Sequence, residues 1–364
     1  MSGASPKTFD PPLSTSNLVR PERAALMGYA RAVYAGAPVV AWLEKRLAMF
    51  HEAAHCVTVC NGFWALVLAI HGLAVPGRSD VLMPSLTYRR MADVIAWTRR
   101  RPRFCEVDPA TLAATPGTMR AALTSEVGLL LAVHPIVGTC DVAGLVGLAD
   151  EVGLPLLFDS VESVFERVAG GKVGGFGNAE CFSLHASKLI NGCEGGYITT
   201  NDPALAARLA DLRNGTALDG MDARLNGMHA AMALAGLDGL DDQVRRNRAR
   251  YDTYRRLLAN VEGLRLLPFD DPAACSCKTI VVELTDAFPL NRAQTLARLN
   301  AVQVLARAYY HPPLHAKSMA YPHVPAELPG TSALAERFML LPCGDHVSIA
   351  DIETVVRFLL ELTA

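Results

Sequence analysis

The strongest constraint on the fold is an alternation of short aliphatic runs with Ala/Leu-rich stretches between about residues 54 and 200. Pro, Gly, Asp or Asn bounds each run, as in chains where strands and helices alternate. Several runs are apolar at consecutive positions, which indicates strands buried on both faces of a mainly parallel sheet, with helices above and below it. The expected strands cover residues 56–60, 80–83, 103–107, 128–134, 154–159, 180–184 and 196–199.

The composition changes near Arg245, where a charged helix begins. Strand-like runs follow at 278–284 and 303–305, and a final helix is expected from Ser348. This pattern predicts a smaller α+β domain after the sheet. We therefore expect an α/β protein with a three-layer αβα architecture, divided into an N-terminal arm (1–24), a large domain (25–240) and a small C-terminal domain (241–364).

The charge balance argues against nucleic acid or a membrane as the partner. Lys and Arg number 34 against 36 Asp and Glu, so the basic surface of a nucleic-acid binder is not expected. The longest apolar stretch, 127–133, is too short to cross a bilayer, and the first residues lack a signal-peptide pattern. Nine cysteines without a CxxC pair fit reduced thiols. We expect a cytoplasmic protein that acts on small molecules.

Two features place candidate functional groups where strands end. Residues 60–66 read Cys-Asn-Gly-Phe-Trp-Ala-Leu, a strand that turns at Gly62 into an apolar helix. Amides at the start of such a helix can bind an anion, although the same junction is common without a ligand. Asp159 ends the apolar run Leu-Leu-Phe-Asp. An acid there either caps a helix or pairs with a buried cation.

The third feature is Lys188, which follows an apolar strand in the run FSLHASKLINGCEGG at 182–196. Lysine is rare inside proteins, so this residue either extends its amine to the surface or has a special role. A buried lysine can form a Schiff base with an aldehyde cofactor, and the upstream Asp159 could keep a pyridine nitrogen protonated.

A longer resemblance contains all three features. The run at 182–196 is similar to the Schiff-base motif of the DegT/DnrJ/EryC1/StrS aminotransferase family. The similarity continues, in order, through CNGFWALVLAI (60–70), MPSLTY (83–88), VDPATL (107–112), HPIVGTCDV (134–142), LPLLFDS (154–160), GMDARLNGMHAAM (220–232) and YHPPLH (310–315). It implies the fold type I architecture of pyridoxal 5′-phosphate enzymes. It also implies amino transfer from an amino acid donor to a keto group of a sugar nucleotide, a cyclitol or another secondary-metabolite intermediate.

The resemblance implies a role for each residue around the cofactor ring. Lys188 would form the Schiff base and later carry a proton, and Asp159 would pair with the pyridinium nitrogen. Tyr88 would stack on the face of the ring. Glu162 occupies a position that is commonly Gln or His in the family, near the phenolic oxygen of the cofactor. A second acid there could alter protonation around the ring.

Around the cofactor phosphate, the resemblance implies that Ser183 and the amides after Gly62, at Phe63 and Trp64, hold the anion. Phe63 stands where the family usually has a hydroxyl residue, which removes one hydrogen bond. The segment around Asp222 would come from the other subunit of an obligate homodimer with shared active sites. Asp222 stands where Asn is usual, and its carboxylate cannot donate a hydrogen bond to phosphate.

Substrate contacts are expected from Arg224, Tyr310 and His315. Two interpretations of Asp222 stay open. Its charge either repels the cofactor phosphate, or it is neutralised by Arg224, so that the pair positions a substrate carboxylate or phosphate.

One motif and two other functions compete with this interpretation. His51-Glu52-Ala53-Ala54-His55 spells HExxH, but a zinc protease needs both histidines on one helix, and the next residues look like a strand. We expect no metal site there. The altered cofactor neighbours also leave open an elimination, replacement or decarboxylation reaction on the same fold, or a non-catalytic regulator that binds the cofactor.

Overall fold

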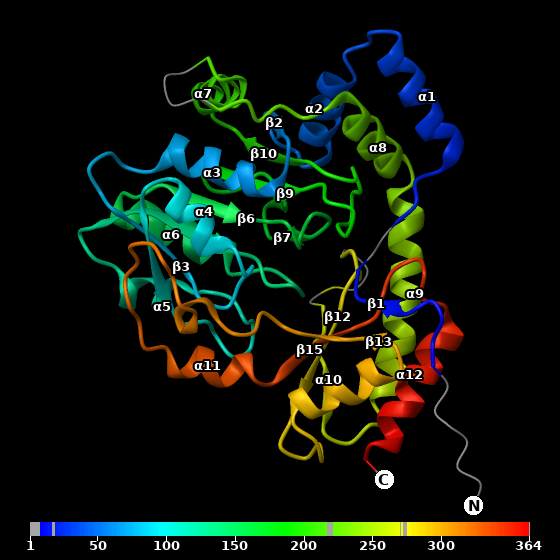
Figure 1. Cartoon of the computed structure of the whole chain (residues 1–364). Coiled ribbons are helices and arrows are strands. Elements are labelled where there is room, and N and C mark those ends of the chain that lie inside the picture. The colour runs from blue at the N-terminus through cyan, green and yellow to red at the C-terminus, as the bar shows by residue number, and fades with distance from the viewer. Residues whose placement is uncertain (1–7, 17–18, 217–220, 270, 272–274, 364) are drawn as a thin grey trace, which may run out of the picture.

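The computed structural model describes residues 8–16, 19–216, 221–269, 271 and 275–363, and it contains two main sheets (Figure 1). The larger sheet has the strand order β2-β10-β9-β6-β5-β3-β4. All neighbouring strands are parallel except β10, which is antiparallel to both β2 and β9. The strands are β2 (His55–Val59), β3 (Asp80–Pro84), β4 (Arg101–Cys105), β5 (Val127–Val133), β6 (Leu156–Asp159), β9 (Ala179–Ser183) and β10 (Gly196–Thr200).

Helices cover both faces of this sheet, as the apolar strands predicted. Alternate residues of β5 point to opposite faces: Leu129 and Leu131 join the core under α3, α4 and α7, whereas Leu130 and Ala132 join the core under α5 and α6. The helices are α3 (Gly62–Leu73), α4 (Met91–Trp97), α5 (Pro116–Ala122), α6 (Val142–Val152) and α7 (Pro203–Asn214). Figure 1 shows a third group, α1 (Arg23–Tyr34), α2 (Val39–Phe50) and α8 (Gly227–Asp238), gathered at one end of the sheet.

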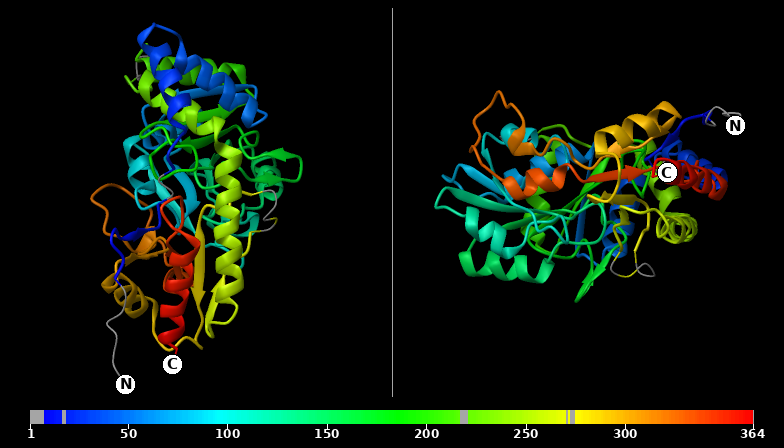
Figure 2. Two further views of the ribbon diagram at one scale, coloured as in Figure 1. Left: turned by 90° about the vertical axis from the view of Figure 1, so that its right-hand side faces the viewer. Right: turned by 90° about the horizontal axis from the view of Figure 1, so that it is seen from below.

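The second sheet has the order β11-β12-β15-β14 and is antiparallel throughout. Helices α9 and α12 run side by side along it (Figure 2). The helices and strands of this part of the chain are α9 (Leu240–Leu258), β11 (Leu264–Leu266), β12 (Ile280–Leu284), α10 (Arg292–Ala301), β14 (Arg307–Ala308), the 3₁₀ turn η1 (Leu314–Ala316), α11 (Pro329–Ala335), β15 (Phe338–Leu341) and α12 (Ile349–Glu361). The domain boundary expected after residue 240 falls at the start of α9 and stays a prediction.

Two short strand pairs complete the fold. The strand expected at 303–305 is β13 (Val304–Leu305), which pairs with β1 (Leu13–Ser14) of the N-terminal arm and not with the second sheet. The other pair is β7 (Arg167–Val168) with β8 (Gly171–Lys172). No helix in the described part of the chain has both the length and the apolarity needed to cross a membrane.

Strand β4 lies two residues earlier than the sequence indicated, over 101–105 instead of 103–107. The reason is a buried acid on the neighbouring strand. Asp80, which is fully buried at the start of β3, accepts a hydrogen bond from Arg101 Nε at 2.7 Å and another from Arg103 Nε at 2.9 Å. Both arginines therefore belong to the edge strand, whereas the sequence placed only Arg103 in it.

We expect Asp80→Ala to lower the free energy of unfolding by about 2–3 kcal/mol, because two charge-assisted hydrogen bonds to a buried acid are lost. Urea unfolding at fixed protein concentration measures this change. Glu151→Ala is the matched control, because it removes the exposed Arg120–Glu151 pair and should leave the unfolding midpoint unchanged. Equal effects of the two substitutions would contradict a role for Asp80 in anchoring β4.

Candidate active site

Lys188 lies in the loop that leaves β9 and returns as β10. Backbone hydrogen bonds hold the two arms of this loop together, from Leu184 N to Gly195 O at 2.8 Å and from Ala186 N to Cys193 O at 3.0 Å. The Lys188 side chain is 22% exposed, and its Nζ donates to Glu162 Oε1 at 2.5 Å. The loop thus presents an amine toward the residues that follow β6.

Glu162 receives a second lysine from the other sheet. Lys278, just before β12, is 3% exposed and donates its Nζ hydrogen to Glu162 Oε2. Burial alone would raise the pKa of Glu162, but the charges of Lys188 and Lys278 outweigh burial and hold that pKa below its ordinary value. Lys278 was missed by the sequence analysis, because nothing in the residues around it marks a partner more than a hundred positions away.

Asp159, the last residue of β6, has a different environment from Glu162. It is 6% exposed, and its Oδ1 accepts a hydrogen bond from Val161 N at 3.2 Å. Burial raises the pKa of Asp159 to about 6, although the Val161 amide and the Lys188 charge oppose the shift. A buried carboxyl in this state can accept a cationic partner, which would stabilise its ionised form.

The start of α3 lies against the end of β9. Asn61 caps the helix by accepting a hydrogen bond from Trp64 N at 3.0 Å. The first amides of a helix, here those of Gly62 and Phe63, have no partner within the helix and can face an anion. A side chain at Gly62 would bring its Cβ to 2.9 Å from Ser183 Cβ, so glycine is what allows this close approach. The helix start and the Ser183 hydroxyl therefore lie together.

Aromatic residues complete the surroundings of Asp159 and Glu162. Burial raises the pKa of Tyr310 well above its ordinary value, and the negative charges of Glu162 and Asp159 raise it further, so both acids act on this phenol electrostatically. Tyr88, which is 37% exposed, also raises the pKa of Tyr310. The structure thus groups Lys188 with four of the other residues singled out from the sequence.

Phe63 carries no hydroxyl toward this region, as its sequence position indicated. Its ring lies 5.7 Å from that of Trp64 in an edge-on arrangement, and the Arg90 guanidinium lies 4.7 Å from the ring centroid. The side chain is used in packing, so only the backbone of residue 63 is available to an anion.

His315 is held within the protein on both ring nitrogens. Nδ1 forms a hydrogen bond of 2.7 Å with Ser85 Oγ, and Nε2 forms one of 3.0 Å with Ser332 Oγ. Direct contact between His315 and a substrate would have to replace one of these bonds, and the expected role stays a prediction.

Asp222 and Arg224 form a two-pronged ion pair on the surface. Arg224 Nε donates to Asp222 Oδ1 at 2.8 Å and Nη2 donates to Oδ2 at 3.0 Å, with the side chains 65% and 69% exposed respectively. The hydrogen bonds from Arg224 lower the pKa of Asp222. Between them, Ala223 O accepts a hydrogen bond from Cys60 N at 2.8 Å, which ties the segment to the end of β2. This is the geometry of the second interpretation, in which Arg224 neutralises Asp222.

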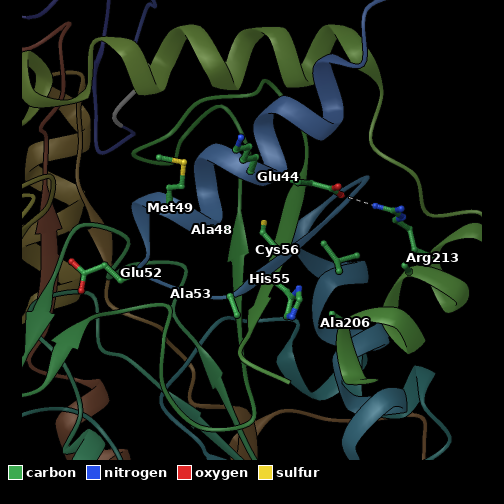
Figure 3. A pocket seen from close by; sticks show the side chains of 13 residues that line it. Glu44, Ala48, Met49, Glu52, Ala53, His55, Cys56, Ala206 and Arg213 are labelled. Carbon is green, nitrogen blue, oxygen red and sulfur yellow. Dashed lines mark hydrogen bonds and ion pairs between the residues drawn. The ribbon is translucent and has the colours of Figure 1, made fainter. Parts of the chain in front are cut away.

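Two cavities of the described part of the chain are candidate sites. One of about 80 Å³ is lined by Lys188, Glu162, Lys278 and Arg307. A larger one of about 480 Å³ opens between α2, β2 and α7 (Figure 3). Both acids labelled there are already paired, since Glu44 Oε1 accepts from Arg213 Nη1 at 2.7 Å and Glu52 Oε1 accepts from Arg167 Nη1 at 3.0 Å. The smaller cavity carries Lys188 and Glu162, two of the residues that the sequence singled out.

The HExxH pattern borders the larger cavity without forming a metal-binding helix. Helix α2 ends at Phe50, His51 is its C-cap, and His55 opens β2, so the two histidines do not share a helix face. The His51 ring is buried between Val173 O and the Tyr197 hydroxyl. Within the described ranges, no group of three or more His, Cys, Asp or Glu side chains could hold a metal ion.

The chain is similar to known proteins over most of its length. The model of the DegT/DnrJ/EryC1/StrS aminotransferase family matches residues 29–360. The erythromycin biosynthesis sensory transduction protein EryC1 of Saccharopolyspora erythraea is 32% identical over 318 residues, which cover 84% of this chain and 85% of that protein. GDP-perosamine synthase of Caulobacter vibrioides is 27% identical over 87% of this chain and 88% of that protein.

A solved structure agrees closely with the fold. The crystal structure of DesI, determined in the presence of its TDP-sugar product, has a TM-score of 0.91 and 32% sequence identity, covering 98% of this chain and 94% of that chain. The architecture expected from the sequence, fold type I with a mainly parallel central sheet, is confirmed.

The raised pKa of Asp159 implies a stability cost in the protein without cofactor. Between its ordinary pKa of 3.8 and about 6, the folded state keeps a proton that the unfolded state has released, so stability falls as the pH rises through this window. We expect Asp159→Asn to remove the penalty and to stabilise the apoprotein at pH 7 by up to about 3 kcal/mol. Urea unfolding across pH measures it. A gain of equal size at pH 4 would contradict the assignment, since both proteins are then neutral at this position.

Proposed function

This chain belongs to the DegT/DnrJ/EryC1/StrS aminotransferase family, and on that premise we propose that it transfers the amino group of an amino acid donor to a keto group of a sugar nucleotide, a cyclitol or another secondary-metabolite intermediate. The cofactor is pyridoxal 5′-phosphate. The observation that carries the proposal is the grouping of the Lys188 amine with a buried acid, Asp159, at the carboxyl ends of two neighbouring parallel strands.

The residues present fit pyridoxal phosphate at three points. An amine, Lys188, is available for an aldehyde carbon. The buried Asp159 carboxyl, whose pKa is raised by burial, suits a protonated ring nitrogen. The start of α3, approached closely by Ser183 because residue 62 is glycine, suits a phosphate. These are the roles that we propose for the four residues.

When bound, pyridoxal phosphate supplies an aldehyde for the donor's amino group and a ring that withdraws electrons from the reacting carbon. Lys188 would hold the aldehyde carbon covalently and afterwards accept and return a proton at the α-carbon of the donor. Asp159 would keep the ring nitrogen protonated. The ionised Asp159 carboxylate and the protonated nitrogen stabilise each other's charge, which offsets the cost of burying them. Glu162, with Tyr88 and Tyr310, would bound the space beside the ring.

The names of the relatives support a sugar nucleotide as the acceptor. GDP-perosamine synthase is named for a product linked to a nucleoside diphosphate, GDP. DesI was crystallised in the presence of its TDP-sugar product. The relative EryC1 is named as a sensory transduction protein, so a regulator without turnover is the alternative to test. Stoichiometric keto acid formation with the aminated product would identify amino transfer, and eliminations or decarboxylations do not leave that pair of products.

We further propose a homodimer with shared active sites. The Asp222–Arg224 pair is exposed, and Ala223 between the two residues is tied to Cys60, just before the start of α3. Helices α1, α2 and α8 pack together and expose large apolar side chains, among them Tyr34 at 89% and Trp42 at 41%. Apolar side chains of this size gain from burial against a partner.

Lys188→Ala should abolish amino transfer, because it removes the amine that we propose to hold the cofactor. Mass spectrometry of the borohydride-reduced wild type should find the pyridoxyl group on the Lys188 peptide. Lys172→Ala is the matched control, since that half-buried lysine lies over the Phe50 ring, and the substitution should retain activity. A pyridoxyl group found mainly on another lysine would sink the proposed attachment site.

Asp222→Asn tests the exposed pair. Because Arg224 already neutralises the carboxylate, the substitution should leave the dissociation constant of pyridoxal phosphate within about twofold, and KM for the acceptor should rise several-fold as Arg224 loses its partner. Fluorescence titration of apoprotein with the cofactor, followed by steady-state kinetics, measures both. Cofactor affinity improved by about tenfold or more would instead establish repulsion between Asp222 and the phosphate.

A further inference from the structure

We propose that Lys278 is a positioning residue that sets the protonation of Lys188 through the carboxylate of Glu162. The inference rests on the proposed role of Lys188 in holding the cofactor. Its basis is geometric: Glu162 divides its two oxygens between two lysines, with Oε1 accepting from Lys188 at 2.5 Å and Oε2 accepting from Lys278. The three side chains form one charged cluster, with a single acid between two cations.

The cluster is shielded from water, so each charge depends on the others. The exposed fractions of the side chains are 22% for Lys188, 15% for Glu162 and 3% for Lys278. Charges in such a setting interact more strongly than on the surface, and removing one leaves its partner unbalanced. Lys278 cannot turn to solvent without breaking its bond to Glu162, because almost none of its side chain is accessible.

The position of Lys278 is also fixed by the chain on either side of it. Two residues earlier, Ser276 Oγ donates to Glu166 Oε1 at 3.0 Å, so the same segment contacts the loop after β6 twice. Two residues later, β12 begins at Ile280, which is paired with Leu341 of β15. The second sheet therefore carries this lysine to a defined point beside the first.

The functional consequence follows from the chemistry of amines. Only a neutral amine attacks an aldehyde, so Lys188 must lose a proton before it can capture the cofactor. A carboxylate at 2.5 Å favours the protonated amine and opposes that loss. Lys278 shares the carboxylate and adds a positive charge nearby, and both effects favour release of the proton from Lys188. An acid at position 162 is thus compatible with cofactor capture because Lys278 balances it.

Other groups face the cluster and contribute a background that the substitutions below leave unchanged. They come from the ends of β3, β6 and β14 and comprise Tyr88, Asp159, Arg307, Tyr309 and Tyr310. Among them, burial raises the pKa of Asp159 to about 6.

The test measures Lys188 directly in apoprotein. Competitive labelling with acetic anhydride between about pH 6 and 10, with mass spectrometry of the Lys188 peptide, reports the fraction of neutral amine. Lys278→Met should move the midpoint of this profile to higher pH and slow covalent capture of pyridoxal phosphate by about tenfold or more at pH 7. Glu162→Gln should move the midpoint to lower pH. The double variant, which loses one charge of each sign, should return close to wild type.

Three controls separate this role from a loss of structure. Lys278→Arg keeps the charge and should restore most of the capture rate. Lys172→Met removes a partly buried lysine elsewhere and should change neither measurement. The exposed Lys45 serves as an internal reference, since its labelling profile should be the same in every variant.

Two results would overturn the proposal. One is an unchanged Lys188 profile in Lys278→Met. The other is capture slowed equally at all pH values and not rescued in the double variant, which would indicate a structural role. Both readouts use protein without substrate, so they are independent of amino transfer. If Lys188 did not hold the cofactor, wild type would fail to form the Lys188 adduct while the labelling profiles still tested the cluster.

Discussion

The carboxylate of Glu162, held between the buried Lys278 and the partly exposed Lys188, links the two sheets of this protein. Glu162 follows β6, Lys188 follows the neighbouring parallel strand β9, and Lys278 precedes β12 of the second sheet. Parallel neighbours end at the same edge of a sheet, which brings the first two together. Because a buried charge is costly without its partner, the second sheet cannot move away without leaving Glu162 or Lys278 unbalanced.

The neighbours of Asp159 and Glu162, two acids of one short segment, shift the pKa values of these acids in opposite directions. Asp159 is shielded from water with little compensation, and burial raises its pKa to about 6. Burial acts on Glu162 as well, but two ammonium groups reverse the direction and lower its pKa. One acid is thus ready to receive a cation, and the other is already neutralised. The first arrangement lowers the stability of the empty protein at neutral pH and favours a cationic ligand, as often occurs in active sites.

At the edge of the site, the sequence did not show which partners the side chains have within the protein. The Asp222 carboxylate could repel a phosphate or be neutralised, and its two hydrogen bonds from Arg224 favour the second interpretation. His315 was expected to contact the substrate, but both of its ring nitrogens form hydrogen bonds with serine hydroxyls. Phe63 likewise packs its ring against a tryptophan and an arginine. Side chains that the motifs suggest for ligand binding thus already have hydrogen-bond or packing partners within the protein.

The sequence by itself determined the strands of the large sheet, the helices on both faces, and the placement of Lys188 and Asp159 at strand ends, because these follow from short-range periodicity and turn residues. Only the tertiary structure decided that β10 runs antiparallel, that charged β4 starts at Arg101 against the buried Asp80, and that Lys278 reaches Glu162. Each of these depends on which distant groups share a buried, poorly solvated space. Local residue patterns do not show which distant groups are buried together. The strength of a charge pair depends on its burial and on the distance between the charges, which only packing sets.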